Sequence, residues 1–175
     1  MKISTVISML SFLFFTTTLS AQNVRPDSVW TSCNYLMGDW IGEGDGATGK
    51  GSGEFSFHFD LDKNILVRKN HSQYAGEKGK PATHDDMMII YPSAAGVPDH
   101  AIYFDNEGHT INYTIAFTNE NKTIVFTSEK KPGAVTFRLS YIFSDASYVT
   151  IKFEVATPNN PDTFRNYISG TAHKK

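Results

Sequence analysis

The residues best suited to chemistry in this chain are histidines and carboxylates that lie a few positions apart. One group is the run His84-Asp85-Asp86, and a second is the pair Asp105 and His109 on either side of Asn106-Glu107-Gly108. Imidazole and carboxylate groups together suit the binding of divalent metals and proton transfer. They also form turn caps and rim ion pairs, and Asn-x-Gly sequences form hairpin turns for backbone reasons. We favour these structural roles for both groups and expect no metal.

Strand geometry limits which of these groups can act together. Adjacent residues of a strand point to opposite faces, so His84 and Asp86 can converge but Asp85 cannot join them. Asp105 and His109 can meet across their hairpin, at a rim. An enzyme that acts on a small substrate through His71 or His84, with Asp86 or Asp105, is one alternative function. The chain has no nucleophile-elbow motif and no Cys-x-x-Cys-His motif for covalent haem attachment.

The elements that would position these groups alternate apolar and polar residues, as half-buried strands do. Short turns separate them, which favours sequential antiparallel hairpins over crossovers. We therefore predict an all-β fold, a closed antiparallel up-and-down barrel of about ten strands with a short N-terminal helix. The first strand begins at Asp39, and the others are expected at 54–60, 65–74, 85–91, 100–105, 109–117, 122–128, 134–143, 148–156 and 163–171.

Three other segments of the chain have distinct expected roles. Residues 29–37, with Ser28 as a candidate N-cap, predict one or two helical turns that would plug one barrel end. The glycine-rich segment 42–53 is expected to be flexible or sharply curved. The loop 75–83 is long enough to act as a portal or lid.

Most strands have one apolar face, which is expected to line the interior. The strand at 65–74 departs from this, because Arg68 lies on one face and Lys69 and His71 on the other. Tyr103 and Asp105 likewise share a face that opposes apolar neighbours. Polar groups placed where a barrel should be dry are candidate site residues.

Composition limits the class of protein. The chain has 175 residues, enough for one domain, here 22–175, with a formal net charge of -2 and no basic cluster. Nucleic acid is therefore not an expected partner. Cys33 is the single cysteine, so no intrachain disulfide forms, and it is expected to be a small buried residue.

The N-terminus predicts export. Lys2 precedes an apolar run at 6–15, and small polar residues follow as far as Ala21. This is the layout of a secretory signal peptide at 1–21. The apolar run is too short to span a membrane, so the mature chain is expected in the periplasm or the medium with no membrane span.

Several segments resemble calycin-like barrels, a group that includes lipocalins, fatty-acid-binding proteins and nitrobindins. The start Gly38-Asp39-Trp40 and the spaced Gly42, Gly44 and Gly46 are similar to nitrobindin-like domains. The longer segments resemble an uncharacterised bacterial family of lipocalin-like, nitrobindin-related proteins; they are 51–57, 66–71, 84–86 and 101–109.

The resemblance implies specific roles. Nitrobindins hold a ferric haem through a histidine of the last strand and act on nitrogen oxides; here that histidine is His173. In lipocalins the tryptophan of Gly-x-Trp packs against a basic residue and seals the closed end. The resemblance therefore pairs Trp40 with Arg165 or Arg138.

Our principal hypothesis is an exported barrel that binds a small, largely apolar or amphipathic ligand in its cavity. No cofactor is expected, and haem binding is an alternative that follows from the family likeness. An arginine would neutralise a ligand carboxylate while tyrosine hydroxyls fix its orientation. The candidate lining residues are Arg68, His71, Tyr103, Asp105, Tyr113 and Arg138.

Overall fold

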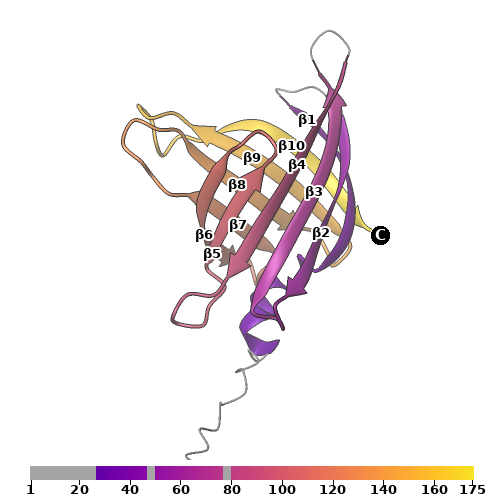
Figure 1. Ribbon diagram of the computed structural model, residues 1–175, viewed down its shortest axis with the longest axis vertical. Helices are drawn as coiled ribbons and strands as arrows, with labels where there is room; N and C mark the ends of the chain where they lie inside the picture. Colours follow the sequence, from indigo (N-terminus) through magenta and orange to yellow (C-terminus); the bar gives the residue numbers. More distant parts are fainter. Residues whose placement is uncertain (1–26, 47–49, 77–79) are drawn as a thin grey trace, which may run out of the picture.

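Hydrogen-bonded ladders join each strand of the chain to the next, and the last strand returns to pair with the first (Figure 1). The computed structural model describes residues 27–46, 50–76 and 80–175. They form a closed ten-stranded antiparallel barrel preceded by a short 3-10 helix, which confirms the predicted fold class. The elements are η1 (Asp27–Cys33), β1 (Gly38–Gly46), β2 (Gly51–Asp60), β3 (Ile65–Ala75), β4 (Pro81–Tyr91), β5 (His100–Asp105), β6 (Thr110–Thr118), β7 (Thr123–Ser128), β8 (Thr136–Phe143), β9 (Tyr148–Ala156) and β10 (Arg165–Lys174).

Three boundaries differ from the prediction. Within the glycine-rich segment 42–53, residues 42–46 and 51–53 belong to regular strands that pair with each other, while 47–49 lie outside the described residues. Strand β4 begins at Pro81 and β3 extends to Ala75, so both ends of the expected loop at 75–83 belong to strands. Strand β10 runs on to Lys174, and an irregularity between Asn166 and Ile168 shifts its register against β9.

The expected signal peptide at 1–21 lies outside the described residues. Within the described ranges, no helix is both long enough and apolar enough to cross a lipid bilayer.

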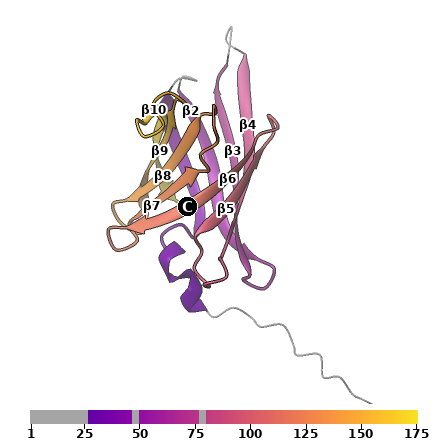
Figure 2. The same ribbon diagram turned by 90° about the vertical axis from the view of Figure 1, so that its left-hand side faces the viewer.

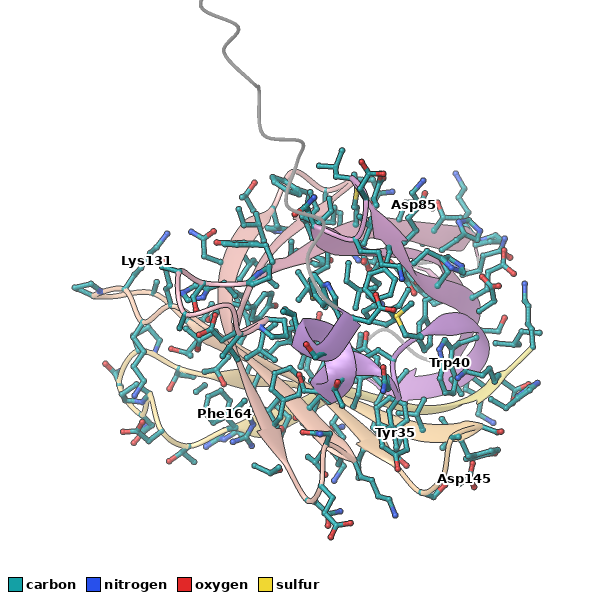
Figure 3. The ribbon with its side chains drawn as sticks, turned by 90° about the horizontal axis from the view of Figure 1, so that it is seen from below. Tyr35, Trp40, Asp85, Lys131, Asp145 and Phe164 are labelled. Atoms are coloured by element: carbon teal, nitrogen blue, oxygen red, sulfur yellow. The ribbon has the colours of Figure 1, made fainter. Side chains whose placement is uncertain are left out.

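Helix η1 covers one end of the barrel, which we call the closed end (Figures 2 and 3). Its buried residues are Trp30 and Cys33, and the Trp30 indole donates a hydrogen bond to the Lys63 carbonyl in the β2–β3 turn, at 2.9 Å. Burial raises the pKa of the Cys33 thiol to about 12. A 3-10 helix at 27–33 thus replaces the helix expected at 29–37, and it covers the barrel end as expected.

Trp40 fills the barrel just inside the closed end. Its ring stacks on Phe55 with centroids 5.9 Å apart, and its indole donates to the Leu36 carbonyl at 2.9 Å. The basic residue above the ring is Lys174, whose Nζ lies 5.0 Å from the ring centroid. The expected partners, Arg165 and Arg138, were wrong, because strand β10 carries Lys174 directly opposite Trp40.

Alternation along the strands sorts side chains into an inner and an outer face. On β8 the inner residues Tyr141 and Phe143 are buried, as expected. On β3 the inner face is the one that carries Leu66 and Arg68, which are buried, while Lys69 and His71 are exposed on the outside. The face of β3 that carries Leu66 and Arg68 therefore lies inside the barrel, which the sequence alone could not decide.

Candidate functional site

A buried ion pair lies at the centre of the polar side of the barrel. Arg68 on β3 contacts Asp86 on β4, and their side chains are only 9% and 5% exposed. The second Asp86 oxygen accepts a hydrogen bond from the Asn70 amide at 3.0 Å. Burial disfavours the charged guanidinium, but the neighbouring Asp86 carboxylate outweighs this and raises the pKa of Arg68. The two opposite charges therefore compensate each other inside the barrel.

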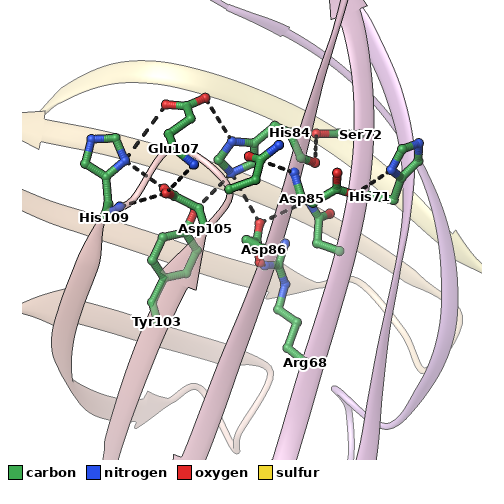
Figure 4. A network of polar contacts seen from close by, with 12 residues as sticks. Arg68, His71, Ser72, His84, Asp85, Asp86, Tyr103, Asp105, Glu107 and His109 are labelled. Atoms are coloured by element: carbon green, nitrogen blue, oxygen red, sulfur yellow. Dashed lines mark hydrogen bonds and ion pairs between the residues drawn. The ribbon is translucent and has the colours of Figure 1, made fainter.

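His84 continues this network toward the end of the barrel opposite η1, which we call the distal end (Figure 4). Its Nε2 lies 2.9 Å from the Tyr103 hydroxyl and 3.5 Å from Asp86 Oδ2, and its Nδ1 lies 3.2 Å from Glu107 Oε1. The hydrogen bond to Asp86, and then the one to Glu107, raise the pKa of His84 despite its partial burial.

The β5–β6 hairpin supplies the outermost polar groups. Asp105 accepts hydrogen bonds from the backbone N–H groups of Glu107 and His109, at 3.0 and 2.9 Å, and lies 2.8 Å from the His109 ring. Burial opposes ionisation of Asp105, but these hydrogen bonds hold its pKa below the usual value. The Tyr103 hydroxyl donates to the same carboxylate at 3.3 Å. The predicted meeting of Asp105 and His109 across the hairpin is confirmed.

Two buried polar atoms of the barrel interior have no hydrogen-bond partner among the described residues. They are Arg68 Nε and the Tyr141 hydroxyl. Tyr141 is fully buried, and burial raises its pKa to about 12, so the hydroxyl stays protonated. Its ring lies between the edges of Phe57 and Phe126, with centroids 5.7 and 5.9 Å away. The Arg68 and Tyr141 side chains interact with each other, yet neither of these two atoms makes a hydrogen bond of normal geometry. Buried polar atoms rarely remain so, and each can therefore take a further partner.

An aromatic wall lies across the barrel from this polar side. In the ring of strands, β8 and β9 are opposite β3 to β5. Their inner faces carry Phe137 and Phe153, whose rings stack with centroids 5.7 Å apart, and both side chains are only half-buried although they point inward. The distal half of the barrel therefore presents polar groups on one side and accessible aromatic surface on the other.

The structure brings four of the six predicted lining residues together. Arg68, Tyr103, Asp105 and Tyr113 all lie on inner faces, and the Tyr103 and Tyr113 rings meet edge to face at 6.4 Å. Burial raises the pKa of both tyrosines. His84 and Asp86 converge on the same side, as strand geometry predicted. Tyr141 was missed, although it alone carries a polar tip on the inner face of its strand.

The other two predicted lining residues lie outside. His71 faces outward and pairs with Asp85 at 2.7 Å, beside an outer groove of about 600 Å³. Arg138 also faces outward, where it contacts both Glu154 oxygens at 2.8 and 3.0 Å and covers the Phe164 ring at 4.0 Å. Neither side chain contributes to the inner polar group.

His173 does not fit the role of an internal haem ligand. It lies within β10, opposite Ile41, and its side chain is exposed on the outer face. Its neighbour Ala172 is the residue that points inward and is buried.

Comparison with known proteins gives similarity at the level of structure. No protein-family model matches the chain, and no curated protein matches it. The crystal structure of Rv2717c from M. tuberculosis superposes with a TM-score of 0.57 at 15% identity, covering 84% of this chain and 97% of that one.

Two further structures match with lower scores. The S-type phycobiliprotein lyase CPES from Guillardia theta gives a TM-score of 0.45 at 6% identity, over 81% of this chain and 89% of its own. EF1p2_mFAP2b bound to DFHBI gives 0.42 at 10% identity, over 84% and 99%. The ring of ten strands and its similarity to Rv2717c together identify the fold as a lipocalin-like β-barrel.

Proposed function

We propose that the distal half of this barrel binds a small amphipathic molecule. Its apolar body would lie against Phe137 and Phe153, and its polar end would meet Arg68 Nε and the Tyr141 hydroxyl. The observation that carries the proposal is the pair of unpartnered buried polar atoms in the interior. A buried donor without a partner costs about 1–3 kcal/mol, and a ligand oxygen that accepts from it removes that cost.

The charge balance of the interior indicates what kind of polar end fits. Asp86 already neutralises Arg68, so an added carboxylate would bring an uncompensated negative charge into the barrel. The interior tyrosines stay neutral, because burial raises their pKa values. A neutral acceptor such as a carbonyl or hydroxyl oxygen therefore fits better than the carboxylate expected from sequence.

The proposal also includes the compartment in which the protein acts. The signal-like N-terminal segment supports a barrel that binds its ligand after export, in the periplasm or the medium.

A dye titration tests the interior site. Nile red is planar and neutral and carries a carbonyl oxygen, so its fluorescence reports binding to the amphipathic interior. Tyr141→Phe removes a hydroxyl that interacts with Arg68 but makes no hydrogen bond of normal geometry, so the fold is expected to keep most of its stability while dye affinity falls about fivefold to tenfold. The matched control is Tyr148→Phe, because Tyr148 is 49% exposed. It should leave the affinity unchanged.

Two outcomes would overturn the proposal. One is the absence of saturable Nile red binding to the wild type. The other is equal affinity of both tyrosine variants and the wild type, which would place the dye outside the interior. Native mass spectrometry of the protein purified from its own compartment then identifies the natural ligand.

A further inference from the structure

Metal-ligating atoms converge at the distal rim of the barrel, outside the proposed ligand site. His84, Asp105 and Glu107 each offer one donor atom, and these three atoms lie within 4.8 Å of one another. The three residues come from β4, from the end of β5 and from the hairpin that follows it (Figure 4). Residues of separate segments thus meet at one position.

We propose that His84, Asp105 and Glu107 bind one divalent transition-metal ion of the zinc type. An imidazole nitrogen with carboxylate oxygens is a donor set for Zn²⁺ and similar ions, whereas Ca²⁺ and Mg²⁺ take oxygen ligands. Three protein ligands leave the fourth position of the tetrahedral geometry that Zn²⁺ prefers to a water molecule. His109 lies beside the site, with its Nδ1 2.8 Å from Asp105 and 3.8 Å from Glu107, but it is not one of the three converging donors.

The charge of the cluster favours a cation. Among the described residues, the ion-pair partners of Asp105 and Glu107 are histidines, with no lysine or arginine within ion-pair distance. With neutral imidazoles the cluster therefore carries two uncompensated negative charges. Asp86 differs, because Arg68 neutralises it. A bound divalent cation would neutralise the Asp105 and Glu107 carboxylates at the rim, as Arg68 neutralises Asp86 in the interior.

The surrounding contacts hold the ligands in orientation before any ion binds. His84 Nε2 faces the Tyr103 hydroxyl and Asp86, which leaves Nδ1 directed at Glu107. Asp86 is itself fixed by Arg68 and Asn70. A metal-binding histidine usually contacts a carboxylate through its second ring nitrogen, and removal of such partners typically costs tenfold to a hundredfold in affinity.

Isothermal titration with ZnCl₂ tests the site on the metal-free wild type. We expect one Zn²⁺ per chain. Affinity should fall at least about tenfold in both His84→Gln and Glu107→Gln, since each loses one ligand. The matched control is His71→Gln, because His71 also pairs with an aspartate, at 2.7 Å, but on the outer face. Tyr103→Phe removes a contact that orients His84, and it should weaken Zn²⁺ binding without changing the number of sites.

The inference is refuted if the wild type binds no Zn²⁺, or if His71→Gln loses as much affinity as His84→Gln. Glu107 is half exposed on a hairpin, so Glu107→Gln is expected to fold normally, which circular dichroism checks. Nile red binding by Glu107→Gln separates this inference from the ligand proposal. An unchanged dye affinity with lost Zn²⁺ binding shows that the rim and the interior are separate sites.

Discussion

Arg68 and Asp86 form an ion pair diagonally across two neighbouring strands, inside the barrel. The register pairs Arg68 with Met88 and Asp86 with Asn70, so the two charged side chains must lean along the strands to meet. Both are almost fully buried. Burial of two charges is costly, and such a pair is stable only while both partners are present.

Breaking this pair from one side should therefore destabilise the fold strongly. Arg68→Met is expected to lower the free energy of unfolding by about 3–5 kcal/mol, because Asp86 would remain charged and buried. The double variant Arg68→Met with Asp86→Leu should recover most of that loss. Urea unfolding measures both, and Arg138→Met on the outer pair should cost only about 1 kcal/mol. A double variant no more stable than Arg68→Met would contradict this account.

The contact between Lys174 and Trp40 should contribute measurably to stability. Lys174→Met keeps the aliphatic stem but removes the charge above the ring, so a loss of about 0.5–1 kcal/mol is expected. Arg165→Met is the control, because Arg165 is exposed. Thermal unfolding followed by tryptophan fluorescence measures the difference. Equal melting temperatures for both variants would show that the contact between Lys174 and Trp40 does not stabilise the fold.

Cys33 should be unreactive while the fold is intact. Its pKa of about 12 leaves almost no thiolate near neutral pH, and its side chain is fully buried at the end of η1. Ellman's reagent at about pH 8 should label the protein only in concentrated guanidinium chloride. Rapid labelling without denaturant would mean that η1 leaves the barrel end readily.

The same pKa shift predicts a pH dependence of stability. The folded state favours the neutral thiol, so the stabilisation is present below the usual thiol pKa of 9.0 and is lost as the pH rises toward about 12. Cys33→Ala should lose less stability over this alkaline range than the wild type does. Parallel slopes for the two proteins would show that Cys33 does not contribute.

Gly53 should tolerate substitution less well than Gly42. A Cβ atom at Gly53 would lie 2.5 Å from the His71 carbonyl oxygen and 2.9 Å from Ser72 Cα, both backbone atoms of β3. At Gly42 the nearest atom would be 3.3 Å away. Gly53→Ala is therefore expected to cost about 1–3 kcal/mol, and Gly42→Ala less, in thermal or urea unfolding. The reverse order would indicate that β2 and β3 can separate without penalty.

The period-two alternation in the sequence was enough to predict most strands and the closed barrel. It placed Tyr103 and Asp105 on the same face of β5. It also placed Tyr113 on the apolar inner face of β6. It did not decide β3, because both faces of that strand carry polar residues. The prediction that Arg138 lines the cavity was wrong and avoidable, because alternation along β8 puts Arg138 on the face away from the apolar residues Phe137 and Leu139.

The rest of the site depends on contacts between strands that are distant in sequence. His84 meets Tyr103 and Glu107 only because β4 and β5 pair in a particular register. Lys174 reaches Trp40 because β10 pairs with β1. Local patterns carry no information on such registers, so the contact of Lys174 with Trp40 and the approach of His84 to the β5–β6 hairpin could be found only in the structure.

Closure of the barrel between β1 and β10 also constrains when the protein can fold. One of the two ladders of β1 requires β10, the last strand of the chain. During synthesis β1 is made before the other strands, and one of its edges is unpaired until β10 emerges. Contacts between such distant segments form slowly. The barrel therefore cannot close until β10 has been made, and Trp40 gains its contact with Lys174 only then.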